Sequence, residues 1–73
     1  MEQDLDATYP TVARWVMEYG WIEIGQGDMS RSFIRALDEG GLVWQGRAHY
    51  PTLDAALQDL ETALAAWMHE QGL

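Results

Sequence analysis

The chain has 73 residues, the size of one small domain, and contains no cysteine. Twelve Asp and Glu residues against four Arg, with no Lys, give a formal net charge of −8. The absence of cysteine excludes disulfides and thiolate metal sites. The negative charge repels phosphate backbones and anionic lipid surfaces, so it disfavours nucleic acids and membranes as partners. Acidity that serves only solubility is an open alternative.

The apolar share of 48%, with four Trp, indicates a folded chain. No apolar run approaches the roughly 20 residues that span a bilayer. The acidic start, "MEQDLDATYP", differs from a secretory signal, which is basic and then apolar, so we expect a cytoplasmic protein. Residues 1–8 are predicted to be a flexible acidic tail, and residues 9–73 a single α+β domain.

The tripeptide "YPT" occurs twice, at residues 9–11 and 50–52, and each copy precedes apolar residues at helical spacing. Proline restricts the residue before it, and a threonine hydroxyl can accept hydrogen bonds from the first backbone amides of a helix. Both copies are therefore interpreted as helix starts. At the first copy, Pro10 could instead be the first helical residue, with Thr8 or Tyr9 as the cap.

Two amphipathic helices follow from the periodicity of the apolar residues. The first is predicted over residues 10–19 and ends at Gly20; its buried stripe is Val12, Trp15, Val16 and Tyr19. The second is predicted over residues 53–70, with Gly72 beyond its end; its buried stripe is Leu53, Leu57, Leu60, Leu64 and Trp67. Glu61 is expected on the solvent side of this second helix.

Three strands are predicted between the helices, over residues 21–25, 32–38 and 42–47. "DEGG" (38–41) suits a tight turn that ends in a left-handed glycine, and "GQGDMS" (25–30) suits a looser connection. The fold class is thus α+β, in the order α-β-β-β-α, with a three-stranded antiparallel meander and both helices packed on one face.

This element order resembles that of the double-stranded-RNA-binding domain, over residues 9–70. The resemblance implies that both helices cover the same face of the sheet. In that family, lysines at the start of the second helix bind phosphates. The corresponding residues 51–56 of this chain include no base and one acid, Asp54.

Alternation along the strands predicts which side chains share each face of the sheet. The face under the helices is expected to hold Ile22, Ile24, Ile34, Ala36, Leu42 and Trp44. The opposite face, which we call the outer face, is expected to hold Trp21, Glu23, Phe33, Arg35, Leu37, Val43, Gln45 and Arg47. Glu23 and Arg35 are placed to neutralise each other across adjacent strands.

No catalytic, cofactor or metal site emerges from the residues. His49 and His69 lie before and near the end of the second helix, too far apart to share an ion. Ser30 and Ser32 have no His close in sequence that could act as a base. The segment "GQGDMSRS" lacks the GK[ST] ending of a phosphate-binding loop. The protein is therefore not expected to be an enzyme or to hold a cofactor.

Half of the outer face is apolar, which is typical of an interaction surface. We therefore expect a small non-enzymatic domain that self-associates, as a dimer, through the eight outer-face residues. One alternative is an adaptor or inhibitor that binds a basic protein through its acidic surface. Another is single-stranded nucleic-acid binding on the aromatic and arginine side chains of that face. Exposed apolar residues without a function are the remaining interpretation.

Overall fold

The computed structural model describes residues 5–25 and 31–73, and the fold is α+β with the predicted order of the main elements. The helices are α1 (Leu5–Thr8), α2 (Pro10–Arg14), its π-helical continuation η1 (Trp15–Tyr19) and α3 (Leu53–Gln71). The strands are β1 (Gly20–Ile24), β2 (Ile34–Asp38) and β3 (Gly41–Gln45). They form one antiparallel sheet in the order β1-β2-β3.

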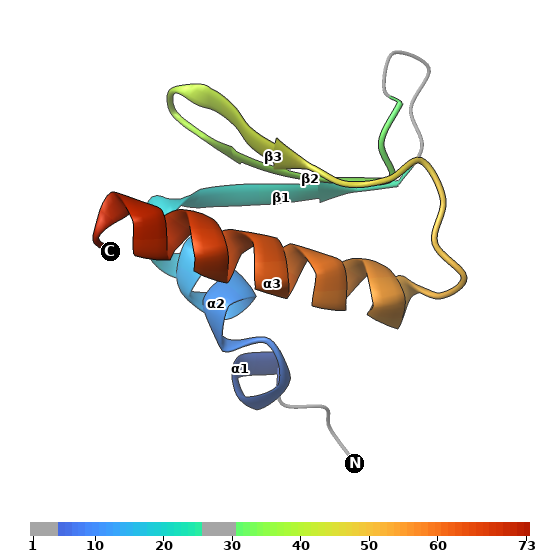
Figure 1. The fold of residues 1–73 in the computed structure, drawn as a ribbon, viewed down its shortest axis with the longest axis horizontal. Coiled ribbons are helices and arrows are strands. Elements are labelled where there is room, and N and C mark those ends of the chain that lie inside the picture. Colours follow the sequence, from blue (N-terminus) through green and yellow to red (C-terminus); the bar gives the residue numbers. More distant parts are fainter. Residues whose placement is uncertain (1–4, 26–30) are drawn as a thin grey trace.

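The sheet forms one layer and the helices form the other, as Figure 1 shows. The core between the layers is built from buried apolar residues of η1, β2 and α3; these are Trp15, Ile34, Ala36, Ala56, Leu60, Leu64 and Met68. None of the helices in this part of the chain is long and apolar enough to cross a membrane. The second face of the sheet has no helix over it among the described elements.

The amino-terminal region differs from the expected tail. Residues Leu5–Thr8 form one helical turn, α1, and residues 1–4 of the predicted tail lie outside the described residues. Tyr9 interrupts the helix before Pro10; at φ −132° and ψ 69° it lies outside the α region, which a following proline disfavours.

The two "YPT" segments start helices in different ways. Thr52 caps α3 as predicted, since its hydroxyl oxygen accepts a hydrogen bond from the Ala55 N–H at 3.0 Å. At the first segment Pro10 is the first helical residue, the alternative that the sequence left open, and Tyr9 precedes it without a side-chain cap.

Glu61 takes over the capping of α2, which corrects its expected solvent position on α3. Its two carboxylate oxygens accept from the Thr11 N–H at 3.0 and 2.9 Å, and one of them also accepts from the Val12 N–H at 2.9 Å. These amides belong to the first turn of α2 and have no partner within the helix. The carboxylate therefore fixes the start of α2 to the middle of α3.

The helix predicted over residues 10–19 is present, but its second half, η1, is a π-helix. The wider π turn rotates the residues after Arg14 away from their positions in a regular α-helix. Trp15 is buried, and its indole N–H donates to the Trp21 carbonyl at 3.3 Å. Val16, expected in the buried stripe, is instead 47% exposed.

The buried stripe of α3 is also displaced from the prediction. Ala56, Leu60, Leu64 and Met68 are buried, while Leu57 and Trp67 pack at the side of the core. Leu53, predicted in the stripe, is 54% exposed. A small residue, Ala56, thus faces the sheet, which lets the helix lie close to it.

Candidate functional site

The outer face of the sheet holds an apolar row and a polar row, each crossing all three strands. In the apolar row Trp21 pairs with Leu37, and Leu37 pairs with Leu42. In the polar row Glu23 pairs with Arg35, and Arg35 pairs with Gln45. Cross-strand partners share a face, so each row presents its side chains on the same side.

A bulge in β3 exchanges the expected places of Leu42 and Val43. The register shifts between Ala36 and Leu37, so β3 has one more residue than β2 at this point. Leu42, predicted under the helices, lies opposite Leu37 on the outer face and is 53% exposed. Val43, predicted on the outer face, packs against the core.

The polar row is internally neutralised. The Arg35 Nε lies 3.2 Å from the Glu23 Oε1, the ion pair that the sequence predicted. A second guanidinium nitrogen donates to the carbonyl and hydroxyl oxygens of Ser32 at 2.6 and 3.1 Å. Gln45 is exposed at the β3 end of the row. The outer face is thus an almost charge-balanced area on a strongly acidic protein.

Phe33 and Arg47 lie at the end of the sheet and turn toward the loop before α3. Phe33 is half-buried, packs at the side of the core and has its ring centroid 6.2 Å from that of Tyr50. The Arg47 guanidinium lies over the same tyrosine ring at 5.7 Å. The structure therefore brings Trp21, Leu37 and Leu42 together, and it separates Phe33 from this group.

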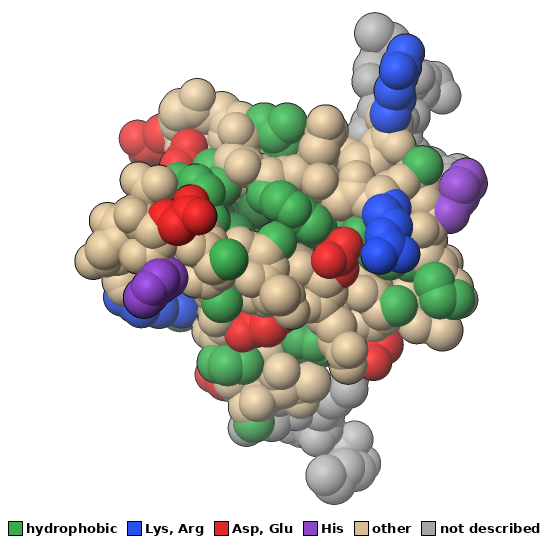
Figure 2. Space-filling model, in the orientation of Figure 1, with side chains coloured by type: hydrophobic (Ala, Val, Ile, Leu, Met, Phe, Trp, Pro, Cys, Tyr) green, Lys and Arg blue, Asp and Glu red, His purple; other side chains and the backbone are tan. Residues whose placement is uncertain are grey.

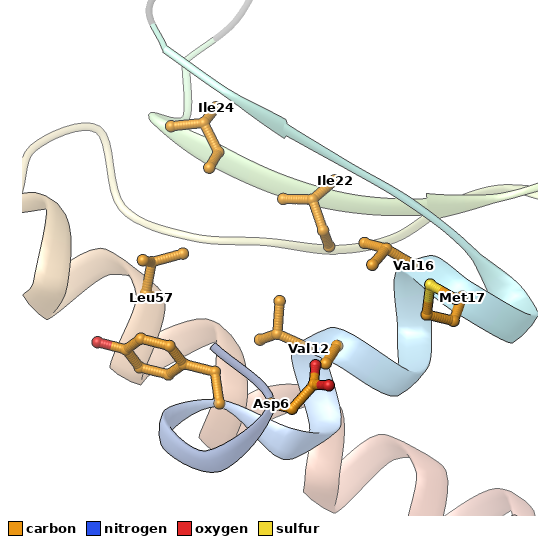
Figure 3. Close-up of a pocket in the computed structure, with 9 residues that line it drawn as sticks. Asp6, Val12, Val16, Met17, Ile22, Ile24 and Leu57 are labelled. Atoms are coloured by element: carbon orange, nitrogen blue, oxygen red, sulfur yellow. The ribbon is translucent and has the colours of Figure 1, made fainter. Parts of the chain in front are cut away.

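The helix side of β1 carries an apolar groove that the sequence analysis missed (Figure 3). Its volume is about 350 Å3, and its walls are almost wholly apolar. The side chains come from α1, α2, η1, β1 and α3, with Tyr9 between the first two helices; they are Asp6, Tyr9, Val12, Ala13, Val16, Met17, Ile22, Ile24 and Leu57. Ile22 and Ile24 point from the sheet into the groove, Ile22 near Val12 and Val16 and Ile24 on the side of Leu57.

The groove is the result of incomplete coverage of β1. Ile24 was expected under the helices, yet it is 48% exposed, and Met17 on the opposite wall is 80% exposed. The signal in the sequence was Met17, an apolar residue of the 10–19 helix that lies outside its predicted stripe of Val12, Trp15, Val16 and Tyr19.

Tyr9 lines the groove, and its hydroxyl has a polar partner on α3. Its hydroxyl donates to the Asp54 carboxylate of α3, and this hydrogen bond is the main cause that raises the pKa of Tyr9 to about 12. Tyr50 has a similar role between β3 and α3, where its hydroxyl donates to Asp59 at 2.6 Å and accepts from the Arg47 N–H. Desolvation by burial, and then the bond to Asp59, raise the pKa of Tyr50.

The residues singled out in the sequence for metal or catalytic chemistry lie apart in the described part of the structure. No three His, Cys, Asp or Glu side chains in residues 5–25 and 31–73 are placed to hold an ion. The two histidines lie at opposite ends of the view in Figure 2. Ser32 is buried and bound by Arg35. Ser30 lies outside the described residues, as do residues 26–29 of the connection predicted over 25–30.

Comparison of the chain with protein-family models, with curated proteins and with solved structures finds no match. The resemblance to the double-stranded-RNA-binding domain is limited to the order of the elements.

Proposed function

We propose that this protein is a small, non-enzymatic interaction domain that self-associates through the outer face of its sheet. The observation that supports this most directly is the apolar row Trp21, Leu37 and Leu42 on a face that none of the described helices covers. Trp21 is 44% exposed at one edge strand and Leu42 is 53% exposed at the other. A second copy would bury both side chains at once.

Charge also favours a second copy on this face. Two molecules of net charge −8 repel each other, so a self-interface belongs where the local charge is lowest. The Glu23–Arg35 ion pair neutralises the polar row that lies beside the apolar row on the outer face. A two-fold arrangement would place apolar row against apolar row, with the polar rows at the rim.

Single-stranded nucleic-acid binding has weaker support from the geometry. Base stacking needs aromatic rings with an open face, but the ring of Phe33 packs beside Tyr50. Of the two arginines expected to contact phosphates, Arg35 is paired with Glu23 and Arg47 lies over Tyr50.

The test is the solution mass by light scattering across a concentration series, for the wild type, Leu42→Glu and Leu53→Glu. Both leucines are about half exposed, and only Leu42 lies on the sheet. We expect a wild-type dimer whose dissociation constant rises at least about tenfold in Leu42→Glu, because burying an unpaired carboxylate costs more than about 1.4 kcal/mol.

Leu53→Glu should remain dimeric, and circular dichroism should show that both variants keep their secondary structure. A wild-type protein that is monomeric at every concentration would refute the proposal. A dimer that survives Leu42→Glu unchanged would place the interface elsewhere.

A further inference from the structure

The free edge of β1 lies directly above the groove. In the order β1-β2-β3, β1 is an edge strand, and no other strand of the described chain pairs with its far side. The Gly25 N–H donates to the Phe33 carbonyl at 2.7 Å, so this N–H group is directed toward the neighbouring strand β2. Because this direction alternates along an antiparallel strand, Ile22 and Ile24 direct their N–H and C=O groups to the free edge.

The same two residues send their side chains down into the groove (Figure 3). A strand added beside β1 would continue the sheet about 4.8 Å further out. Every second side chain of that strand would point to the helix side, between the isoleucines and the wall formed by Val16 and Met17. The edge offers backbone hydrogen bonds and the groove offers apolar contacts, which together are what strand addition uses.

The charge near this edge and groove is negative. Asp6 is the acidic residue among those that line the groove. Glu23, which also pairs with Arg35, lies between the two isoleucines on the other face of β1, and the whole chain carries a net charge of −8. A cationic segment therefore suits the site better than a second copy of this acidic chain.

We propose that β1 binds an extended segment of another protein as a fourth strand, and that this segment alternates apolar and basic residues. Its apolar side chains enter the groove against Ile22, Ile24 and Met17. Its basic side chains lie on the outer side of the sheet, beside the Glu23 carboxylate that Arg35 also contacts. The site is separate from the apolar row of the outer face, so it does not depend on self-association.

The probe is a nine-residue peptide of alternating valine and lysine, with a fluorescent label at one end. One matched control has the same sequence with its backbone amides methylated at alternate residues, which removes the hydrogen bonds of one edge. A second control has the same composition, with the valines at helical spacing. Fluorescence anisotropy gives the dissociation constant for each peptide at low and high salt.

We expect saturable binding of the alternating peptide with one site per chain. Backbone methylation should weaken it at least tenfold, and high salt should weaken it as well. The double variant Val16→Gln and Met17→Gln should also lose at least tenfold, and both positions are exposed enough to keep the fold. Leu53→Gln, an exposed position outside the groove, should bind like the wild type.

Three results would overturn the proposal. The first is no binding of the alternating peptide at low salt. The second is equal or tighter binding of the helically spaced peptide, which would make the groove a helix site. The third is binding that neither backbone methylation nor the groove variants change, since net charge alone would explain it. The first peptide comparison uses the unmodified protein, so a folding defect cannot obscure it.

Discussion

Replacing Glu61 by alanine tests whether one carboxylate of α3 holds α2 in place. The change removes the acceptor of two backbone N–H groups, those of Thr11 and Val12. Loss of a helix cap costs about 0.5–2 kcal/mol, and a hydrogen bond to a charged group contributes about 1.5–3 kcal/mol. Thr11 and Val12 are half-buried, so water can replace part of the hydrogen bonding that the variant loses. We expect the free energy of unfolding to fall by about 2–3 kcal/mol.

This is a large fraction of the stability of a 73-residue chain, which is roughly 4–11 kcal/mol at about 0.05–0.15 kcal/mol per residue. Urea unfolding, followed by circular dichroism, measures this loss of stability. The unfolding midpoint should shift to a lower urea concentration, and the dependence of the free energy on urea should stay the same. Glu61→Gln keeps one acceptor oxygen and should lose about 1 kcal/mol.

Glu70→Ala is the matched control for Glu61→Ala. It removes the same charge from the same helix, and therefore relieves the same long-range repulsion, but Glu70 is exposed in the last turn of α3. There a negative charge opposes the helix dipole, so this variant should equal or slightly exceed the wild-type stability. If Glu61→Ala unfolds within about 0.5 kcal/mol of Glu70→Ala, the capping role is refuted.

Two further predictions concern close contacts between elements. Gly46→Ala should lower the melting temperature markedly more than Gly40→Ala. A Cβ at Gly46 would come within 3 Å of three side chains, including Tyr50, whereas a Cβ at Gly40 meets only Asp38, at 3.3 Å. Equal melting temperatures of the two variants would contradict this. The raised pKa of Tyr9 favours its protonated form in the folded state, so stability present below pH 10 should be lost as the pH rises toward 12. The difference between the alkaline absorbance titrations of the wild type and Tyr9→Phe isolates the Tyr9 step, which should have its midpoint near pH 12. A difference curve with its midpoint near pH 10 would contradict it.

The sequence predicts the elements of this fold well because the residues that start and end helices and turns act on their neighbours in the chain. Gly72 ends α3 in the left-handed conformation at φ 78°, and Gly41 closes the hairpin at φ 119°. Thr52 caps α3 through a bond three residues away. Each of these signals depends only on neighbours in the chain, so one sequence is enough to read them.

The features that the sequence did not reveal are set by contacts between distant residues. Glu61 caps a helix about 50 residues earlier in the chain, and periodicity alone places it in solvent. The bulge that exchanges Leu42 and Val43 is a property of the pairing between two strands. A single extra residue in β3 reverses which side chain faces the helices. The sequence does not show where such a bulge occurs, so it could not assign Leu42 and Val43 to the correct faces.

The same contacts explain why the groove exists. α3 is 19 residues long and packs on β2, whereas α2 and η1 are five residues each and hold Trp15 between the layers. Burying Trp15 through a π turn leaves Val16 and Met17 directed toward β1 without filling the space beneath it. Edge strands in small proteins are protected by charge or by a covering element. On β1 a single charged side chain, Glu23, interrupts an apolar strand, and no described element covers the edge, so β1 has little of this protection.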